Sequence, residues 1–339
     1  MKTGKLSHEI LSSLLDKHVK DLDRKDERII QGSKIGEDAA VIDIPGEKYL
    51  VAKTDPITFT TDQIGYYVVN VNVNDIVCTG AEPKWFQSTI LLPEKKTSKS
   101  LIERIFRQIH DACKTMNISV IGGHTEITTG LNKPIIIGML LGEVKKDKLV
   151  NTSGVKPGDS LILTKGIFIE GTSIIAREKQ DFLRKHNFNQ EFIEKCKNFL
   201  YNPGISVYKE ARLAHNHFKI NGMHDPTEGG LACGIAEMAI ASNAGVIIEE
   251  DKIEILPESE KLSKIFNLNP LGIISSGSLL IGVDEELTKD VINLLVKNNI
   301  KATKIGEFVQ KDNGLKIINK DKQITNLKYS EIDEIIKIF

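Results

Sequence analysis

The sequence predicts a protein of two domains, each of which mixes α-helices with β-strands. Segments rich in β-branched residues alternate with helical patterns up to about Val144. The loop SGVKPGD, with Pro157 and two glycines, then interrupts the pattern before strands and helices resume. A chain of 339 residues, 40% of them hydrophobic, can bury more than one core. We therefore expect one domain over residues 1–153 and another over 154–339.

The first domain is predicted to begin with a helix. Apolar residues recur there at helical spacing: Leu6, Ile10, Leu11, Leu14 and Leu15. AAVIDI and YLVAKTDPITF follow as β-branched strands, which places Asp38 and Asp55 at strand edges. The valine-rich stretch from Gln63 to Thr79 could be a strand. Its length, asparagines one turn apart and Gly80 as a possible cap favour a helix, with Asp75 near its end.

The later elements follow from the same two periodicities. KWFQSTILLP, ISVIGGHTEIT and PIIIGMLLGEV are predicted strands, and the first two flank a long amphipathic helix that contains Leu101, Ile105, Ile109 and Ala112. In the second domain, helices are predicted from Ile205 to His217 and from Leu231 to Asn243. The remaining predicted strands there are SLILTKG, SSGSLLIGVD, KIGEFV and GLKIIN.

Composition narrows the class of partner and compartment. Lysine plus arginine (45) nearly balances aspartate plus glutamate (46), so no strong field favours nucleic acid or an anionic membrane. No run is long and apolar enough for a membrane span, and the opening segment lacks the continuous apolar core of a signal peptide. The four cysteines are scattered without CxxC or zinc spacing, so we expect no disulfide or structural zinc and a reducing, cytoplasmic compartment.

Four short segments each set an aspartate against apolar or glycine-rich sequence. They are IGEDAAVID with Asp38, AKTDPITF with Asp55, VNVNDIVCTGAEP with Asp75 and HDPTEGGL with Asp225. Magnesium prefers oxygen ligands and shares one or two carboxylates with substrate phosphates, so an acidic site for a nucleotide triphosphate implies magnesium. Any single aspartate is more often a turn or cap residue, and we assign that role to Asp43, Asp62 and Asp159.

Glycine pairs add a possible phosphate-binding element. Gly229 and Gly230 allow close backbone approach before a predicted helix, whose amino end attracts anions, although Asp225 or Thr227 could simply cap that helix. GGHTE, with Gly122, Gly123 and His124, is a weaker signal of the same kind. P-loop, GxGxxG, GxSxG and HExxH motifs are absent. Cys233, on an alanine-rich helix, is interpreted as a small buried hydrophobe.

These motifs resemble a superfamily of four kinds of protein: aminoimidazole ribonucleotide synthetase, thiamine-monophosphate kinase, selenophosphate synthetase and the hydrogenase maturation protein HypE. GEDAAV, TDPITF, NVNDIVCTGAEP, GGHTEI, HDPTEGGL and SSGSLLI occur in the expected order between about Lys34 and Gly282, most like HypE. The resemblance implies an amino-terminal α/β domain, whose sheet forms a barrel across a homodimer, and a carboxyl-terminal α+β domain. It also implies that the first domain dimerises and binds ATP and metal, with ATP lying between the domains.

Site roles follow from the matched positions. The resemblance implies that Asp38, Asp55, Asp75 and Asp225 hold magnesium on ATP, with Glu228 assisting through water. Residues of the same motifs are candidates for nucleotide contact: Lys53, Thr54, Asn74, Gly122, Gly123, His124, Thr227, Glu228 and Gly229. Lys53 could neutralise phosphate charge, although a lysine ending a strand is usually solvated. The HypE-like segment GGHTE has His124 where thiamine-phosphate kinases have an acidic residue, which argues against direct metal binding there.

The carboxyl terminus departs from the HypE pattern. HypE-like tails end in a cysteine that is carbamoylated and then dehydrated with ATP, whereas this chain ends KYSEIDEIIKIF, with no cysteine after Cys233. Ile332, Ile335, Ile336 and Phe339 are expected to pack as a terminal amphipathic helix. We expect an ATP- and magnesium-dependent enzyme that activates an unidentified small acceptor by phosphoryl transfer. The alternatives are thiamine-monophosphate kinase and a nucleotide-binding maturation factor that acts through a protein partner.

Overall fold

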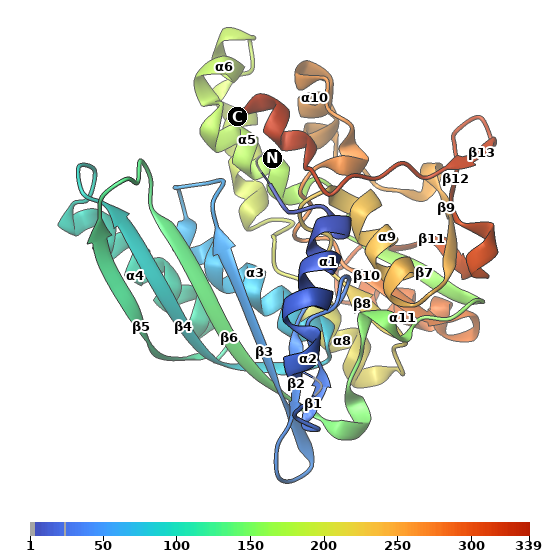
Figure 1. The fold of residues 1–339 in the computed structure, drawn as a ribbon. Coiled ribbons are helices and arrows are strands. Elements are labelled where there is room, and N and C mark those ends of the chain that lie inside the picture. Colours follow the sequence, from blue (N-terminus) through green and yellow to red (C-terminus); the bar gives the residue numbers. More distant parts are fainter. Residues whose placement is uncertain (1–3, 24) are drawn as a thin grey trace. The chain divides into compact units, whose positions relative to one another are not determined.

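The computed structural model describes residues 4–23 and 25–339, which form two compact units (Figure 1). The first unit comprises Arg28–Gln31 and Ala39–Leu149. The second unit comprises Val150–Phe339 together with Gly32–Asp38 and the segment that ends at Glu27. The start of the chain thus groups with the carboxyl-terminal unit. Local sequence patterns do not predict this, because the packing of a short amphipathic helix depends on contacts with residues far along the chain.

The first unit is a six-stranded sheet with one layer of two helices. The sheet order is β1-β2-β3-β6-β4-β5, and neighbours are antiparallel except the parallel pair β4 and β5. The strands are β1 (Ile29–Gln31), β2 (Ala40–Asp43), β3 (Lys48–Ile57), β4 (Glu82–Pro93), β5 (Ser119–Thr128) and β6 (Ile135–Lys145). Helix α3 (Ile64–Cys78) packs on β3, β6 and β4 and against α4 (Lys99–Thr115).

The two faces of this sheet differ in burial. On the face toward α3, the cross-strand pair Phe86 and Leu140 is fully buried. On the opposite face, Trp85 pairs with Leu141, and both side chains are only half-buried. Because successive strand residues point to opposite faces, both faces of the central strands carry apolar side chains. One of these apolar faces lacks a helical cover among the described residues of the unit.

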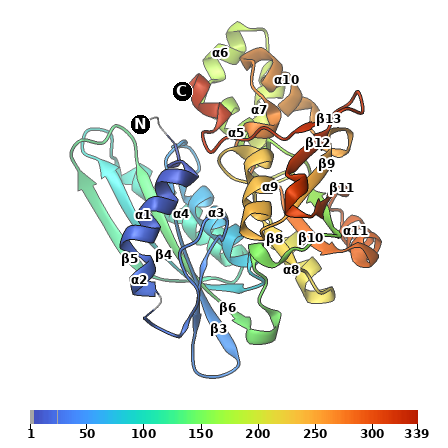
Figure 2. The ribbon, with the colours of Figure 1, turned by 45° about the vertical axis from the view of Figure 1, so that its right-hand side comes forward.

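The second unit is built on a seven-stranded sheet of order β13-β12-β9-β11-β7-β10-β8. Its strands are β7 (Asp159–Thr164), β8 (Gly222–His224), β9 (Gly245–Glu249), β10 (Leu280–Asp284), β11 (Ala302–Val309), β12 (Leu315–Ile318) and β13 (Ile324–Asn326). Its helices are α1 (His8–His18), α2 (Lys20–Asp23), α5 (Ile169–Glu178), α6 (Gln180–Lys185), α7 (Gln190–Lys197), α8 (Tyr208–His217), α9 (Gly230–Ala241), α10 (Pro257–Phe266) and α11 (Thr288–Lys297). Helix α11 packs on β7 and β11 and against α8. Figure 2 labels α11, α8 and β11 in this unit.

Helix α9 lies at the centre of this unit's core. All its residues except Ile240 are buried, which fits a segment that is apolar on every side. It contacts β8 and β9. The loop that carries HDPTEGGL therefore connects an edge strand of the sheet directly to a buried helix.

Several predicted elements are confirmed. The stretch from Gln63 to Thr79 is the helix α3, and Gly80 follows it with φ of +78°, as its capping role requires. The predicted terminal helix is a 3₁₀ helix, Glu334–Ile338, in which Ile335 is fully buried while Phe339 stays 53% exposed. All four cysteines are buried free thiols. Among the described residues, no helix has the length and apolar character needed to cross a membrane.

Candidate functional site

The first unit brings together two of the predicted metal-binding aspartates. Asp55 lies within β3 and Asp75 in the last turn of α3. The Lys53 ammonium lies 3.3 Å from Asp55 Oδ2 and 3.4 Å from Asp75 Oδ1. A lysine between two carboxylates occupies the position in which a cation is favoured, so this cluster fits magnesium by charge and by its oxygen donors. Lys53 is thus not the solvated strand-end residue of the alternative interpretation.

Asn72 fixes the backbone at Asp55. Its Oδ1 accepts from the Asp55 N–H at 3.0 Å, and its Nδ2 donates to the Val68 carbonyl at 2.8 Å. The neighbouring Thr54 hydroxyl donates to the Gly138 carbonyl at 2.8 Å, and so it is engaged in the sheet. Asn74 is fully buried in α3. The helix therefore positions the acidic segment through Asn72, which the sequence analysis did not select.

The second unit brings together the other two predicted metal-binding aspartates. Asp38 precedes β2, Asp225 follows β8, and a carboxylate oxygen of each lies within 4.8 Å of the other. Asp38 Oδ2 also contacts the Thr152 hydroxyl at 3.4 Å. Glu37, the residue before Asp38, accepts from the Thr152 N–H at 3.1 Å, which secures this segment. Two carboxylates at this separation are spaced as ligands of a shared cation would be.

His224 connects Asp38 to the helix α9. Its Nδ1 is 2.9 Å from Asp38 Oδ2, and its Nε2 is 3.0 Å from Glu237 Oε2. Burial alone would lower the pKa of His224, but the two carboxylates hold it well above the usual value. Burial alone would raise the pKa of Glu237, but hydrogen bonds from His224 and His8 hold it well below the usual value. The group is therefore an imidazolium between two carboxylates.

The loop before α9 is held by both ends of the chain. Lys5 Nζ donates to the Thr227 hydroxyl, and the Lys5 N–H donates to Glu228 Oε2, both at 3.3 Å. The N–H of Gly229 donates to Asp333 Oδ2 at 2.8 Å. Neither Asp225 nor Thr227 caps the helix, because Gly229 is the capping residue and Asp333 supplies the acceptor. In this structure the carboxylate of Asp333 therefore accepts the hydrogen bond of the Gly229 N–H, which the sequence predicts to face a phosphate.

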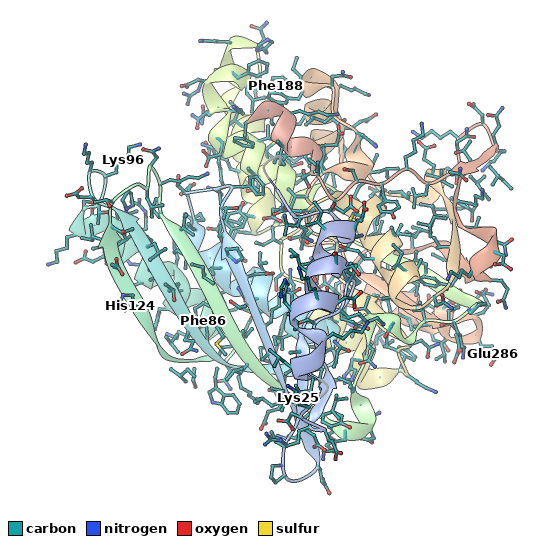
Figure 3. The ribbon with its side chains drawn as sticks, viewed as in Figure 1. Lys25, Phe86, Lys96, His124, Phe188 and Glu286 are labelled. Carbon is teal, nitrogen blue, oxygen red and sulfur yellow. The ribbon has the colours of Figure 1, made fainter. Side chains whose placement is uncertain are left out.

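Gly122, Gly123 and His124 lie apart from these clusters within the first unit. They lie on β5, the edge strand, three strands from β3. Figure 3 labels His124 on this strand. Three strand spacings amount to about 14 Å. His124 Nε2 is 3.3 Å from Glu126 Oε2, and both side chains are exposed. Their role in nucleotide binding remains a prediction.

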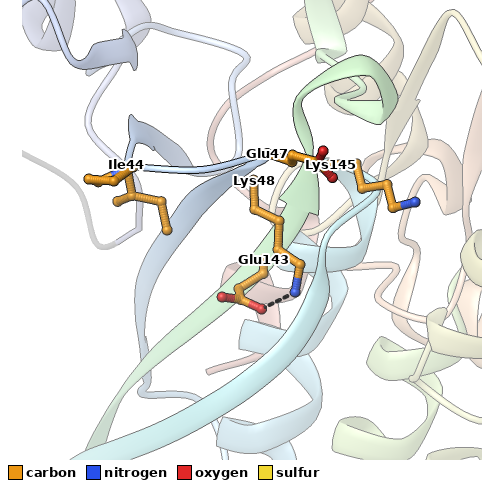
Figure 4. A pocket seen from close by; sticks show the side chains of 6 residues that line it. Ile44, Glu47, Lys48, Glu143 and Lys145 are labelled. Atoms are coloured by element: carbon orange, nitrogen blue, oxygen red, sulfur yellow. Dashed lines mark hydrogen bonds and ion pairs between the residues drawn. The ribbon is translucent and has the colours of Figure 1, made fainter.

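A shallow pocket in the first unit contains none of the predicted residues. It is formed by Ile44, Pro45, Glu47, Lys48, Glu143 and Lys145 (Figure 4). Lys48 Nζ donates to Glu143 Oε2 at 2.6 Å, and this hydrogen bond raises the pKa of Lys48. Lys48 and Asp55 are seven residues apart on one strand, a separation of about 23 Å. The pocket is therefore distinct from the cluster of Asp55 and Asp75.

His224, Glu237, Asn72 and Thr152 were missed as site residues. His224 directly precedes Asp225 in a motif already selected, so adjacency to a predicted ligand was an available signal. Glu237 and Thr152 lie outside every motif. Only the fold brings them to Asp38 and its neighbour His224.

The comparisons with known proteins agree with the fold and the motifs. Residues 36–144 match the model for the amino-terminal domain of AIR synthase related proteins, and residues 156–318 match that for the carboxyl-terminal domain. A protein of Methanocaldococcus jannaschii named as a hydrogenase expression/formation protein is 31% identical over 265 residues, covering 76% of this chain and 75% of the relative. The selenide, water dikinase of the same organism is 27% identical over 338 residues, covering 95% and 94%.

Solved structures show the same fold. HypE in complex with ATP superposes with a TM-score of 0.72 at 20% identity, over 99% of this chain and 98% of that one. AaThiL in complex with AMPPCP and TMP gives 0.72 at 20% identity, over 96% and 98%. The expected two-domain fold and superfamily are therefore confirmed, and the chain belongs to the AIR synthase related protein family.

Proposed function

We propose that this protein is a magnesium-dependent, ATP-binding enzyme that activates a small substrate by phosphoryl transfer. The observation that carries the proposal is the grouping of all four motif aspartates into two pairs, Asp55 with Asp75 and Asp38 with Asp225. Magnesium on a triphosphate uses few carboxylates and offsets the charge of the phosphates. HypE and AaThiL, which share the fold, are known in complex with ATP and AMPPCP respectively.

The chain's own groups have defined tasks in this proposal. The carboxylate pairs hold the cation, and the Lys53 ammonium balances their charge until a cation and phosphate arrive. Asn72 keeps the Asp55 backbone in place, and His224 keeps Asp38 oriented. Contacts from Thr54, Asn74, Gly122, Gly123, His124, Thr227, Glu228 and Gly229 to the nucleotide are part of the proposal. Phosphoryl transfer relies mainly on positioning and charge stabilisation, which these residues can supply.

We place the protein in the HypE-like branch and propose a small oxygen nucleophile as acceptor. The relative in Methanocaldococcus jannaschii supports the branch. Thiamine-monophosphate kinase is the second candidate, since AaThiL is known with TMP. A maturation factor with a protein partner is the third, since HypE is known in complex with HypF.

We further propose a homodimer in which the first-unit sheets build a barrel, in keeping with a dimerising ATP- and metal-binding domain. Every residue of the edge strand β5 except Thr128 is exposed, and Val120, Ile121 and Ile127 are each more than half exposed. A long, apolar, unpaired edge strand is a pairing surface. The half-buried apolar face that includes Trp85 and Leu141 adjoins it across β4. Free, buried thiols fit a reducing, cytoplasmic setting.

Nucleotide binding and turnover test the function separately. Calorimetry should show ATP binding that is lost without magnesium, and no binding at millimolar ATP with magnesium would refute the proposal. ADP release should then rise with one member of a panel of small metabolites. A response to thiamine monophosphate alone would select the second candidate. If ATP bound but no panel member raised ADP release, and a specific protein partner were recovered, the third candidate, a maturation factor, would be selected.

A further inference from the structure

We propose that His8, Cys233 and Glu237 form a binding site for a divalent transition-metal ion of the zinc class. One potential ligand atom from each residue lies within 4.8 Å of the other two. All three residues belong to the second unit: His8 begins α1, while Cys233 and Glu237 lie on α9. This site goes beyond the proposed function, because it involves neither ATP nor the four motif aspartates.

The spacing on α9 places two ligands on one face. Cys233 and Glu237 are four residues apart, so their side chains lie one turn from each other. His8 Nε2 is 3.4 Å from Glu237 Oε1. Metal–ligand bonds of 2.0–2.3 Å in a tetrahedral site set ligand atoms about 3.3–3.8 Å apart. From an upper bound of 4.8 Å, the ligand atoms therefore need to approach one another by about 1.5 Å at most to hold an ion.

The donor set selects the type of ion. Thiolate and imidazole are soft and borderline ligands that favour zinc and its neighbours, whereas magnesium prefers oxygen ligands alone. The Cys233 thiolate and the Glu237 carboxylate together bring two negative charges to a divalent ion, and Glu237 shares its charge with the His224 imidazolium. The thiol proton is released to solvent when the ion binds. Water can take the fourth position, as in zinc sites with three protein ligands.

The ligands already have the outer partners that metal sites use for orientation. His8 Nδ1 lies 3.3 Å from Glu331 Oε1, which leaves Nε2 to face the cluster. The second oxygen of Glu237 accepts from His224 at 3.0 Å, which leaves Oε1 to face His8. A histidine whose other nitrogen binds a carboxylate is the common arrangement at zinc. The alternative is an ion pair between His8 and Glu237 beside a buried Cys233 thiol, and the cobalt titration below distinguishes it from a metal site.

The residues of the cluster differ in their exposure to solvent. Cys233 is fully buried, whereas the side chains of His8 and Glu331 retain 18% and 24% of their exposure. The cluster is therefore closer to solvent on its His8 side than on its Cys233 side. This asymmetry predicts that substitution at His8 leaves the fold intact.

Cobalt titration of the tag-free full chain, stripped of metal by chelation, tests the site without nucleotide. Addition of Co²⁺ alone should produce a thiolate-to-cobalt charge-transfer band that saturates at one ion per chain. Zinc should then bleach the band. Absence of a charge-transfer band in the wild-type chain overturns the proposal, as does a band that magnesium removes as readily as zinc.

Variants assign the band to these residues. Cys233→Ser should abolish it, and His8→Ala should weaken cobalt binding by at least about tenfold, as loss of one ligand implies. Cys196→Ser is the matched control, because Cys196 is an equally buried free thiol of the same unit outside the cluster. The control should keep the band, and circular dichroism should show all three variants folded. A band retained in Cys233→Ser would refute the assignment. If the wild-type chain showed the cobalt band but did not bind ATP, that result would count against the proposed function and not against the metal site.

Discussion

The N–H of Gly229 donates to the carboxylate of Asp333, more than one hundred residues later in the chain, at 2.8 Å. Asp333 Oδ1 also accepts from the Ile335 N–H at 2.8 Å. Burial nevertheless raises the pKa of Asp333 to about 7, against the lowering effect of these hydrogen bonds. The carboxyl-terminal residues are therefore fastened to the start of α9 by a group that titrates near neutrality.

The contribution of Asp333 to stability should fall as pH rises toward 7. The unfolded Asp333 loses its proton near its ordinary pKa of 3.8, whereas the folded one keeps it up to about 7, so the folded state binds more protons in between. The free energy of unfolding should then decrease by up to about 1.4 kcal/mol per pH unit across this window. Asp333→Asn should make that slope shallower in urea denaturation at a series of pH values. The exposed Asp321→Asn serves as control, and an unchanged slope in Asp333→Asn would contradict the assignment.

Gly229 should tolerate no side chain. Its φ is +82°, and a Cβ there would lie 2.5 Å from the Ser330 carbonyl oxygen and 2.7 Å from the Cys233 Cβ. Gly130 has a similar φ of +79° with open space around it. Gly130→Ala should cost about 1 kcal/mol of strain, and Gly229→Ala about 2–4 kcal/mol because overpacking adds to it. If denaturant unfolding showed the same loss of unfolding free energy in both variants, the positive φ alone would account for the cost.

Replacement of Lys53 should change the affinities for magnesium and for ATP in opposite directions. Lys53→Met leaves Asp55 and Asp75 without their shared ammonium, so magnesium alone should bind about fivefold more tightly, equivalent to about 1 kcal/mol. ATP with magnesium should bind more weakly, because a charge that faces phosphate is lost. Lys48→Met is the control on the same strand, where the ion pair is with Glu143. Calorimetry in which magnesium binding weakens or stays unchanged in Lys53→Met would reject the counter-ion role.

Substitutions in the aspartate pairs should weaken ligand binding more than they lower the stability of the fold. Asp55→Asn and Asp225→Asn each remove one oxygen charge from a pair, and binding of ATP with magnesium should weaken by at least about tenfold, or about 1.4 kcal/mol. Asp62→Asn, at an exposed residue outside both pairs, should bind normally. The melting temperatures should differ little. Normal binding with a lower melting temperature would instead assign these aspartates a structural role.

The sequence predicts well those elements whose period is unambiguous. Helix α3 and the strands β3, β4 and β6 lie where the apolar patterns place them. No element is predicted for the stretch that contains α5, α6 and α7, and β8 is only three residues long. Short elements depend on their neighbours in space, so local patterns give a weak signal for them.

The same limit applies to the candidate site. The motifs select all four aspartates, but they do not indicate that Asp38 pairs with Asp225 and Asp55 with Asp75. The motifs do not indicate Asn72 and Glu237. The role of each depends on which residue it contacts in the folded chain, and residue type alone does not reveal that contact. Asp333 is missed for the same reason, since its partner Gly229 lies in another motif. Such couplings across the chain depend on the folded structure.

The grouping of α1 with the second unit has a consequence for synthesis on the ribosome. Translation supplies the whole first unit before α9, and its sheet can form as soon as β6 has emerged. His8 must wait for Glu237, 229 residues later, which takes roughly 10–45 s at ordinary elongation rates. Docking of α1 on α9 therefore cannot begin until Glu237 has been synthesised, and for that time the nascent chain carries the helix without this partner.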